Sequence, residues 1–167
     1  MGMKVFSTDS LDGLTQHARA APRLRNHRNI HLDYGDVCQR LFNAIEPDSY
    51  IAPHRHTALP RDELLMAIRG LMALITFDDE GRIRSIERFG SEKFGPGLAV
   101  GVEVPSETWH TVVALQSGSV LFEVKAGPFD PVQPKELAAW APEESSAEAK
   151  SYLNRLRAQV NGKIKNQ

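Results

Sequence analysis

Between residues 37 and 125 the chain is divided into short apolar or alternating runs, which clusters of Gly, Pro and Asp separate. Many short strands with turns between them favour an antiparallel sandwich or barrel. The predicted strands cover residues 38–45, 50–54, 63–69, 71–77, 82–89, 98–104, 110–115 and 120–125. We therefore expect an all-β body.

Apolar residues recur at helical spacing near both ends of the chain: Leu11, Leu14 and Ala18 at the start, and Leu153, Leu156 and Val160 at the end. Pro22 would end the first helix. Ser145 and Glu148 form a capping box that would begin the second. We thus expect one helix before the body and one after it.

The length of 167 residues suits one domain with a sizeable core. Hydrophobic residues at 41% and charged residues at 25% are ordinary for a globular protein, which argues against disorder. We predict an N-terminal helix and arm over residues 1–36, a barrel over 37–142 and a helical tail over 143–167.

The charge balance and the absence of long apolar runs indicate which partners and which location to expect. Lys and Arg number 20 against 21 acidic residues, so the chain lacks the basic field that nucleic-acid binding needs. No run of about 18 apolar residues occurs, and the first residues do not read as a secretion signal. We expect a cytoplasmic protein with no nucleic-acid or membrane partner.

Cys38 is the single cysteine. It cannot form an intramolecular disulfide or a cysteine-rich zinc site. Any metal must therefore be held by histidine and carboxylate.

A candidate set of such ligands begins at His54 and His56, which would share one face of a strand because they are two residues apart. Glu63 follows beyond a turn, and His110 begins a later strand. Three imidazoles and one carboxylate suit a divalent transition metal such as Fe, Mn, Zn, Ni or Co. Asp62 competes with Glu63 as the carboxylate, and purely structural histidines are the alternative.

The same residues resemble a known pattern. His54, His56, Glu63 and Gly70 resemble the first motif of the cupin superfamily, and His110, with Pro105 before it, resembles the second. The resemblance implies a cupin double-stranded β-helix, or jelly-roll barrel, with one metal ion. Two features depart from the usual pattern: six residues separate His56 from Glu63, and the second motif carries Glu107 and Ala114 where glycine and asparagine are common.

A narrower resemblance covers about residues 10–144. The stretches that carry it are Arg23-x-Arg25, His31, Gln39-Arg40, Ser49-Tyr50-x-x-Pro53-His54-Arg55-His56, Trp109-His110, Glu123-Val124-Lys125-x-Gly127-Pro128 and Trp140-Ala141-Pro142-x-Glu144. They resemble the WbuC family of cupin-fold metalloproteins. This resemblance implies a link to surface polysaccharide biosynthesis and, by analogy, a homodimer.

Several further residues are candidates for binding a substrate. The cations in the family-like stretches would suit an anionic molecule; they are Arg23, Arg25, Arg40 and Lys125. Tyr50 is an even number of residues from His54, so its phenol can share the inward face. Glu123 is a candidate general base if Val120, Phe122 and Val124 pack outward.

From these features we predict a metal-binding cupin enzyme that acts on a small, sugar-derived or carboxylated molecule. Isomerisation, epimerisation and dioxygenation all remain open as reactions, since no residue is assigned as catalytic. The alternative is a non-catalytic protein that binds a metal or a small molecule, such as a sensor, because the sequence shows no clear acid–base pair.

Overall fold

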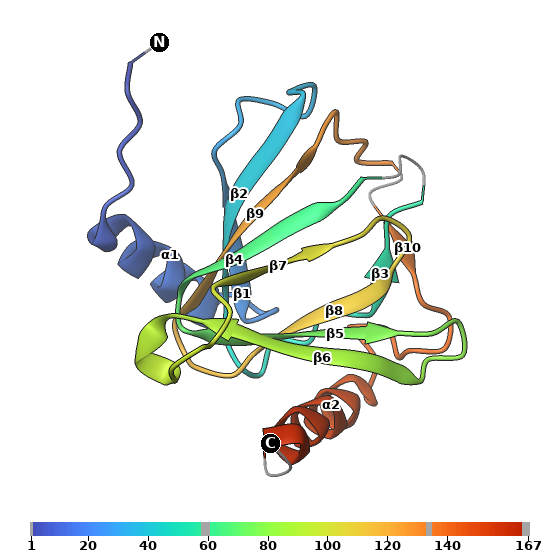
Figure 1. Ribbon diagram of the computed structural model, residues 1–167. Coiled ribbons are helices and arrows are strands. Elements are labelled where there is room, and N and C mark those ends of the chain that lie inside the picture. Colours follow the sequence, from blue (N-terminus) through green and yellow to red (C-terminus); the bar gives the residue numbers. More distant parts are fainter. Residues whose placement is uncertain (1, 58–60, 133–134, 165–167) are drawn as a thin grey trace.

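The computed structural model describes residues 2–57, 61–132 and 135–164. Within them, two five-stranded antiparallel sheets stack face to face (Figure 1). The β9 sheet has the order β1 (Arg25–Asn29), β2 (Cys38–Ile45), β9 (Ser119–Ala126), β4 (Glu63–Arg69) and β7 (Gly101–Val104). The β8 sheet has the order β10 (Glu136–Leu137), β3 (His54–Arg55), β8 (Trp109–Ala114), β5 (Leu71–Phe77) and β6 (Ile83–Gly90). This cupin-like β sandwich confirms the predicted fold class.

The apolar core between the sheets follows from strand alternation, which sends every second side chain inward. The buried residues that meet there include Leu65, Met72, Leu74, Phe89, Val112 and Leu121. Gly70 joins β4 to β5 with a positive φ of 83°, and a Cβ at this position would collide with Ser119. Glycine is therefore required at this turn.

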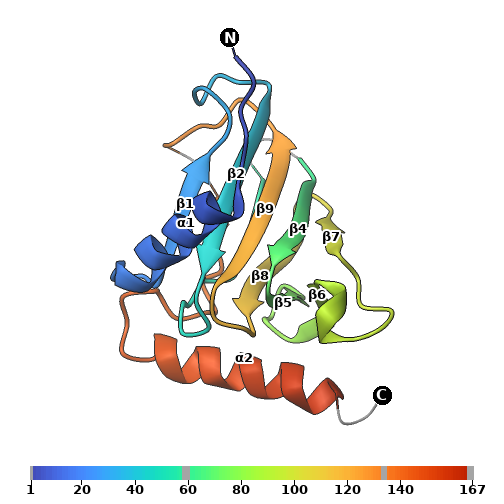
Figure 2. The ribbon, with the colours of Figure 1, turned by 90° about the vertical axis from the view of Figure 1, so that its left-hand side faces the viewer.

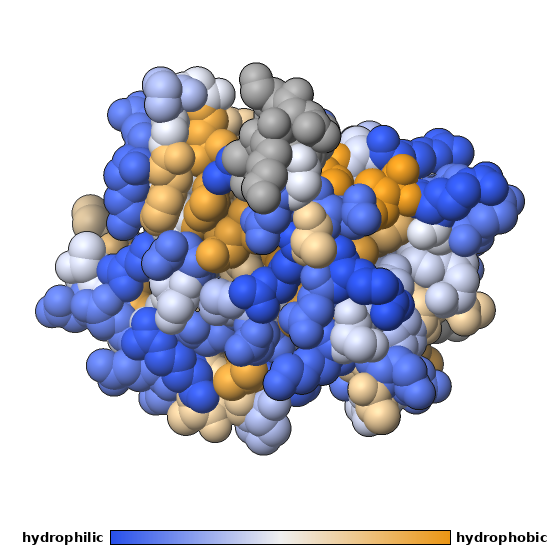
Figure 3. All heavy atoms as spheres, turned by 90° about the horizontal axis from the view of Figure 1, so that it is seen from below, coloured by the Kyte–Doolittle hydropathy of each residue, from blue (hydrophilic) through white to orange (hydrophobic). Residues whose placement is uncertain are grey.

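Two helices cover the outer faces of the sandwich. α1 (Thr8–Ala20) lies across β1 and β2 (Figure 2), and its apolar stripe packs on Phe42, Ala44 and Val120. α2 (Ala149–Ile164) lies against the other sheet, where its predicted stripe of Leu153, Leu156 and Val160 is buried. Figure 3 views the molecule from below the view of Figure 1, and hydrophilic residues predominate on the face that it shows. Both predicted helices are thus confirmed, and each packs on the outer face of one sheet.

The predicted and observed elements differ in places. The predicted ranges 38–45, 63–69 and 71–77 coincide with β2, β4 and β5. In the predicted strand 50–54, only His54 lies in a strand, and the short helix η1 (Glu92–Phe94) was not predicted. α2 begins at Ala149, three residues after the predicted capping box would start it, and it continues past the predicted stop at Asn161.

Two further strands, β1 and β10, were not predicted. β1 reads RNHRN and has no apolar alternation, yet it pairs with β2 along its whole length. The residues predicted as an N-terminal arm thus contribute an edge strand to the β9 sheet. Among the described residues, no helix combines the length and apolar character needed to span a membrane.

Candidate metal centre

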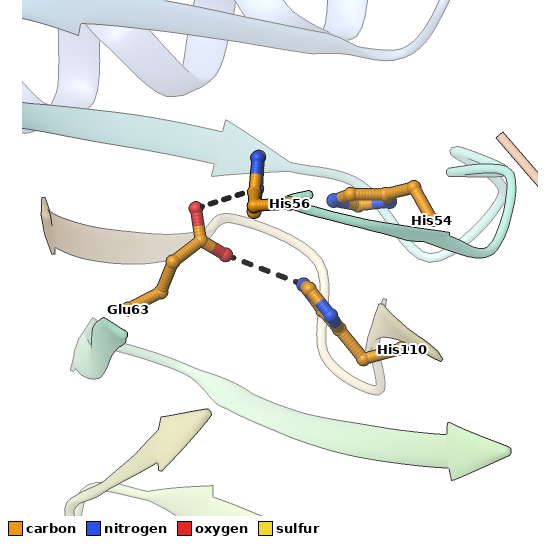
Figure 4. A group of neighbouring side chains, drawn as sticks. All are labelled: His54, His56, Glu63 and His110. Atoms are coloured by element: carbon orange, nitrogen blue, oxygen red, sulfur yellow. Dashed lines mark ion pairs between the residues drawn. The ribbon is translucent and has the colours of Figure 1, made fainter. Parts of the chain in front are cut away.

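Four side chains converge at one end of the space between the sheets. His54 lies on β3, His56 follows that strand, His110 lies on β8, and Glu63 begins β4 in the opposite sheet. One ligand atom from each residue lies within 4.8 Å of the others. Figure 4 shows the side chains pointing toward one another, with the Glu63 carboxylate facing His56 and His110. Both sheets therefore contribute to a three-histidine, one-glutamate group.

Strand register explains how distant residues meet. His54 pairs directly with His110 across β3 and β8, and their ring centroids lie 4.5 Å apart. Glu63 points into the same space as Leu65, two residues further along β4. Asp62 is exposed, and its Oδ1 accepts the backbone N–H of Ser106 at 2.9 Å. The structure thus brings Glu63, and not Asp62, to the histidines.

Backbone carbonyls orient two of the imidazoles. His54 Nδ1 lies 3.0 Å from the carbonyl oxygen of Ala52, and His110 Nδ1 lies 2.8 Å from that of Thr108. A carbonyl only accepts, so each Nδ1 carries the hydrogen and a neutral ring has its lone pair on Nε2. This arrangement is typical of histidines that bind metal through Nε2.

The contacts of Glu63 provide a test of whether these residues fit a metal ion. Its Oε2 lies 3.3 Å from His110 Nε2, and its Oε1 lies 3.0 Å from His56 Nε2. With His110 donating through Nδ1, its Nε2 and the Glu63 carboxylate are two acceptors facing each other. Such a pair requires a proton or a cation between them, so the donor set fits a divalent transition metal.

The electrostatics of the group favour the forms that bind metal. Burial lowers the pKa of His54 well below its ordinary value, and the charge of Lys135 acts in the same direction. Burial would raise the pKa of Glu63, but the adjacent imidazoles of His110 and His56 and the charge of Lys125 hold that pKa well below its usual range. His54 is therefore neutral and Glu63 ionised near neutral pH.

Lys125 connects the group to a second carboxylate. Its ammonium lies 2.7 Å from Glu63 Oε1 and 2.7 Å from Glu123 Oε1. Burial would lower the pKa of Lys125, but these two carboxylates raise it above its ordinary value. Val120 and Phe122 pack toward α1, which turns Glu123 inward. Lys125 and Glu123, both predicted substrate-binding residues, thus adjoin the ligands.

The other predicted substrate-binding residues contact groups other than the four ligands. Arg23 and Arg25 both donate to Oε2 of Glu144, at 2.6 Å each by their nearest nitrogens. Tyr50 packs in the core beneath α2, and its hydroxyl donates to the carbonyl oxygen of Pro142 at 2.9 Å. Arg40 is two residues before Phe42 on β2, so both side chains point to the same face. Because Phe42 packs against α1, Arg40 lies on the outer face of the β9 sheet. The structure does not bring Tyr50 or Arg40 to the metal ligands.

One cation near the group was missed by the sequence analysis. Lys135 precedes β10, and its charge acts on His54. It lies in a proline-containing stretch without strand periodicity, so nothing in the local sequence indicated its position. Only the pairing of β10 with β3 could have revealed it.

Comparison with known proteins places the chain in a family. Residues 6–89 match the family described as "Domain of unknown function (DUF6016)". The chain belongs to this family. No curated protein matches the sequence.

Solved structures resemble the fold at low identity. A protein of Shewanella oneidensis has a TM-score of 0.52 and 14% identity, over 66% of this chain and 72% of that one. A variant of Bacillus subtilis oxalate decarboxylase has a TM-score of 0.50 and 20% identity, over 68% of this chain but only 28% of the decarboxylase. A cupin 2 conserved barrel domain protein from Rhodopseudomonas palustris has a TM-score of 0.48 and 15% identity, over 78% of this chain and 73% of that one.

These likenesses concern the fold alone. The family match and these structures do not assign this member of the DUF6016 family to the WbuC family, so that resemblance stays a prediction.

Proposed function

We propose that this protein is a metal-dependent cupin enzyme that acts on a small anionic molecule. The observation that carries the proposal is the group of His54, His56, Glu63 and His110, whose ligand atoms lie within 4.8 Å of one another. A bound divalent ion would supply Lewis-acid or oxygen-activating chemistry. Surface polysaccharide biosynthesis and a homodimer belong to the proposal only through the WbuC resemblance.

The chain's own residues divide the work at this site. The carbonyl groups of Ala52 and Thr108 orient two imidazoles, and Lys125 fixes the Glu63 carboxylate. Glu123 is an inward carboxylate outside the set of four ligands, and it is a candidate to accept or return a proton while Lys125 holds it. Its position beside the ligands favours an enzyme over a structural site.

The second candidate function is non-catalytic binding of a metal or small molecule. The observation that favours it is the firm pairing of Glu123 with Lys125 at 2.7 Å, because a paired carboxylate is a weaker base. Substitution of Glu123 by Gln separates the two functions: an enzyme would lose turnover with its metal content unchanged, whereas a binding protein would show no turnover in either form.

The metal itself is tested by elemental analysis of protein purified without affinity metal or chelator. We expect about one divalent ion per chain in the wild type, and almost none in a variant with His54, His56 and His110 all replaced by Ala. His17→Ala is the matched control, because His17 is exposed on α1. Equal metal in the triple variant and the wild type would show that these histidines are not ligands.

A further inference from the structure

Lys135 lies on the side of the metal ligands because of strand alternation. The next residue, Glu136, pairs with Arg55 across β10 and β3, and its carboxylate receives the Arg55 guanidinium at 2.9 and 3.0 Å. Arg55 stacks over the ring of Trp109, which packs in the core beneath α2. Glu136 therefore faces outward. Lys135 immediately precedes the strand, so alternation directs it the opposite way, in agreement with the action of its charge on His54.

Lys135 is a partly buried cation without a partner. Among residues 2–57, 61–132 and 135–164, no hydrogen bond or ion pair reaches its ammonium. Burial lowers the pKa of Lys135; Lys125 and Arg23 act in the same direction, while Glu144 and Glu123 oppose them. Its electrostatic neighbours therefore include charged groups that lie on β9, on the opposite sheet.

The carboxylates near Lys135 already have cation partners. Glu63 and Glu123 share Lys125, and Glu144 Oε2 receives both Arg23 and Arg25. The remaining oxygen of Glu144 accepts the backbone N–H of Ala52 at 3.3 Å. A cation left unpaired in a partly buried space is costly, and a ligand of opposite charge would offset that cost.

We propose that Lys135 binds the carboxylate group of a small ligand held beside the four-residue group. This inference rests on the proposed function and adds the chemical class of the ligand and the residue that recognises it. One ammonium without a partner matches one carboxylate. A phosphate dianion would require further donors, and the neighbouring cations Arg23, Arg25 and Lys125 are engaged with glutamates.

The test compares wild type, Lys135→Met and Lys135→Arg, each loaded with Co²⁺ and titrated calorimetrically with acetate, oxalate and inorganic phosphate. We expect a carboxylate to bind the wild type and to bind Lys135→Met about 10- to 100-fold more weakly, as for loss of a charge-assisted hydrogen bond. Lys135→Arg should recover part of the loss. Lys150→Met is the matched control, because Lys150 is exposed on α2.

Three results would overturn the assignment: equal carboxylate affinity in Lys135→Met and wild type, no carboxylate binding by the wild type, or tighter binding of phosphate than of either carboxylate. Cobalt per chain, measured on the same samples, reports separately on the metal centre. Equal cobalt in all variants with no effect on carboxylate affinity would reject the role of Lys135 and leave the proposed function intact. Absence of cobalt from the wild type would reject the proposed function itself.

Discussion

The two ends of the space between the sheets are built from the same strands but have opposite chemistry. On three strands, the inward side chain changes from polar to apolar between residues that are two positions apart. These pairs are Glu63 and Leu65 on β4, His110 and Val112 on β8, and Glu123 and Leu121 on β9. At one end, buried aliphatic and aromatic side chains fill the interior. At the other, imidazoles and charged groups face one another.

This contrast shows how one β sandwich separates stability from chemistry. Burial of the apolar end stabilises the fold, at roughly 25 cal/mol for each Å² removed from water. At the polar end, charged groups are partly buried. Their desolvation costs free energy unless they are paired or bind a ligand. The apolar end can therefore stabilise the strand register, while the polar end contains charged groups whose burial does not stabilise the fold.

Substitution at the apolar end should have the largest effect on stability. Phe89 is fully buried in the inter-sheet core, so Phe89→Ala should lower the free energy of unfolding by about 3–5 kcal/mol, measured by urea denaturation. Metal per folded chain should not change, because none of the ligands belongs to this cluster. If this variant lost its metal while remaining folded, the two ends would not be separable.

A smaller effect is expected from pH at the polar end of metal-free protein. The unfolded chain takes up a proton on His54 below about pH 6.5, whereas the folded chain, with the pKa of His54 lowered by burial, does not. The unfolded state then binds more protons, so stability falls as pH drops below about 6.5, by roughly 1.4 kcal/mol per pH unit at most. Above that pH, His54 contributes no pH dependence.

The comparison that isolates this residue is urea denaturation of metal-free wild type and His54→Asn at pH 7.5 and pH 5.5. The variant should lose less stability between the two values, because it has no imidazole to protonate when unfolded. A pH dependence identical in the two proteins would contradict the assignment of a buried, neutral His54.

The smallest effect is expected from Tyr50→Phe, in the layer between the β8 sheet and α2. The change removes the hydrogen bond from the Tyr50 hydroxyl to Pro142 and should cost about 1 kcal/mol in unfolding free energy. Metal content and carboxylate affinity should match the wild type. A marked loss of ligand affinity would instead restore Tyr50 as a residue of the site, as the sequence had indicated.

Much of the fold could be predicted because alternation is a local signal. The strands 38–45, 63–69 and 71–77 were predicted with their observed bounds, since their inner or outer faces are apolar. β1 and β10 could not be, because they are polar edge strands whose pairing depends on partners distant in sequence. Short edge strands have little burial and therefore little local pattern.

The sequence alone determined the ligand types and the alternation that sends His54 and His110 inward, because both depend on residue identity and a period of two. Only the tertiary structure decided which carboxylate joins them, which way Glu123 points, and that Arg40 lies outside. It also placed Lys135 on the side of the imidazoles, since that position requires β10 to pair with a strand about eighty residues earlier. Contacts set by long-range strand register cannot be inferred from local periodicity.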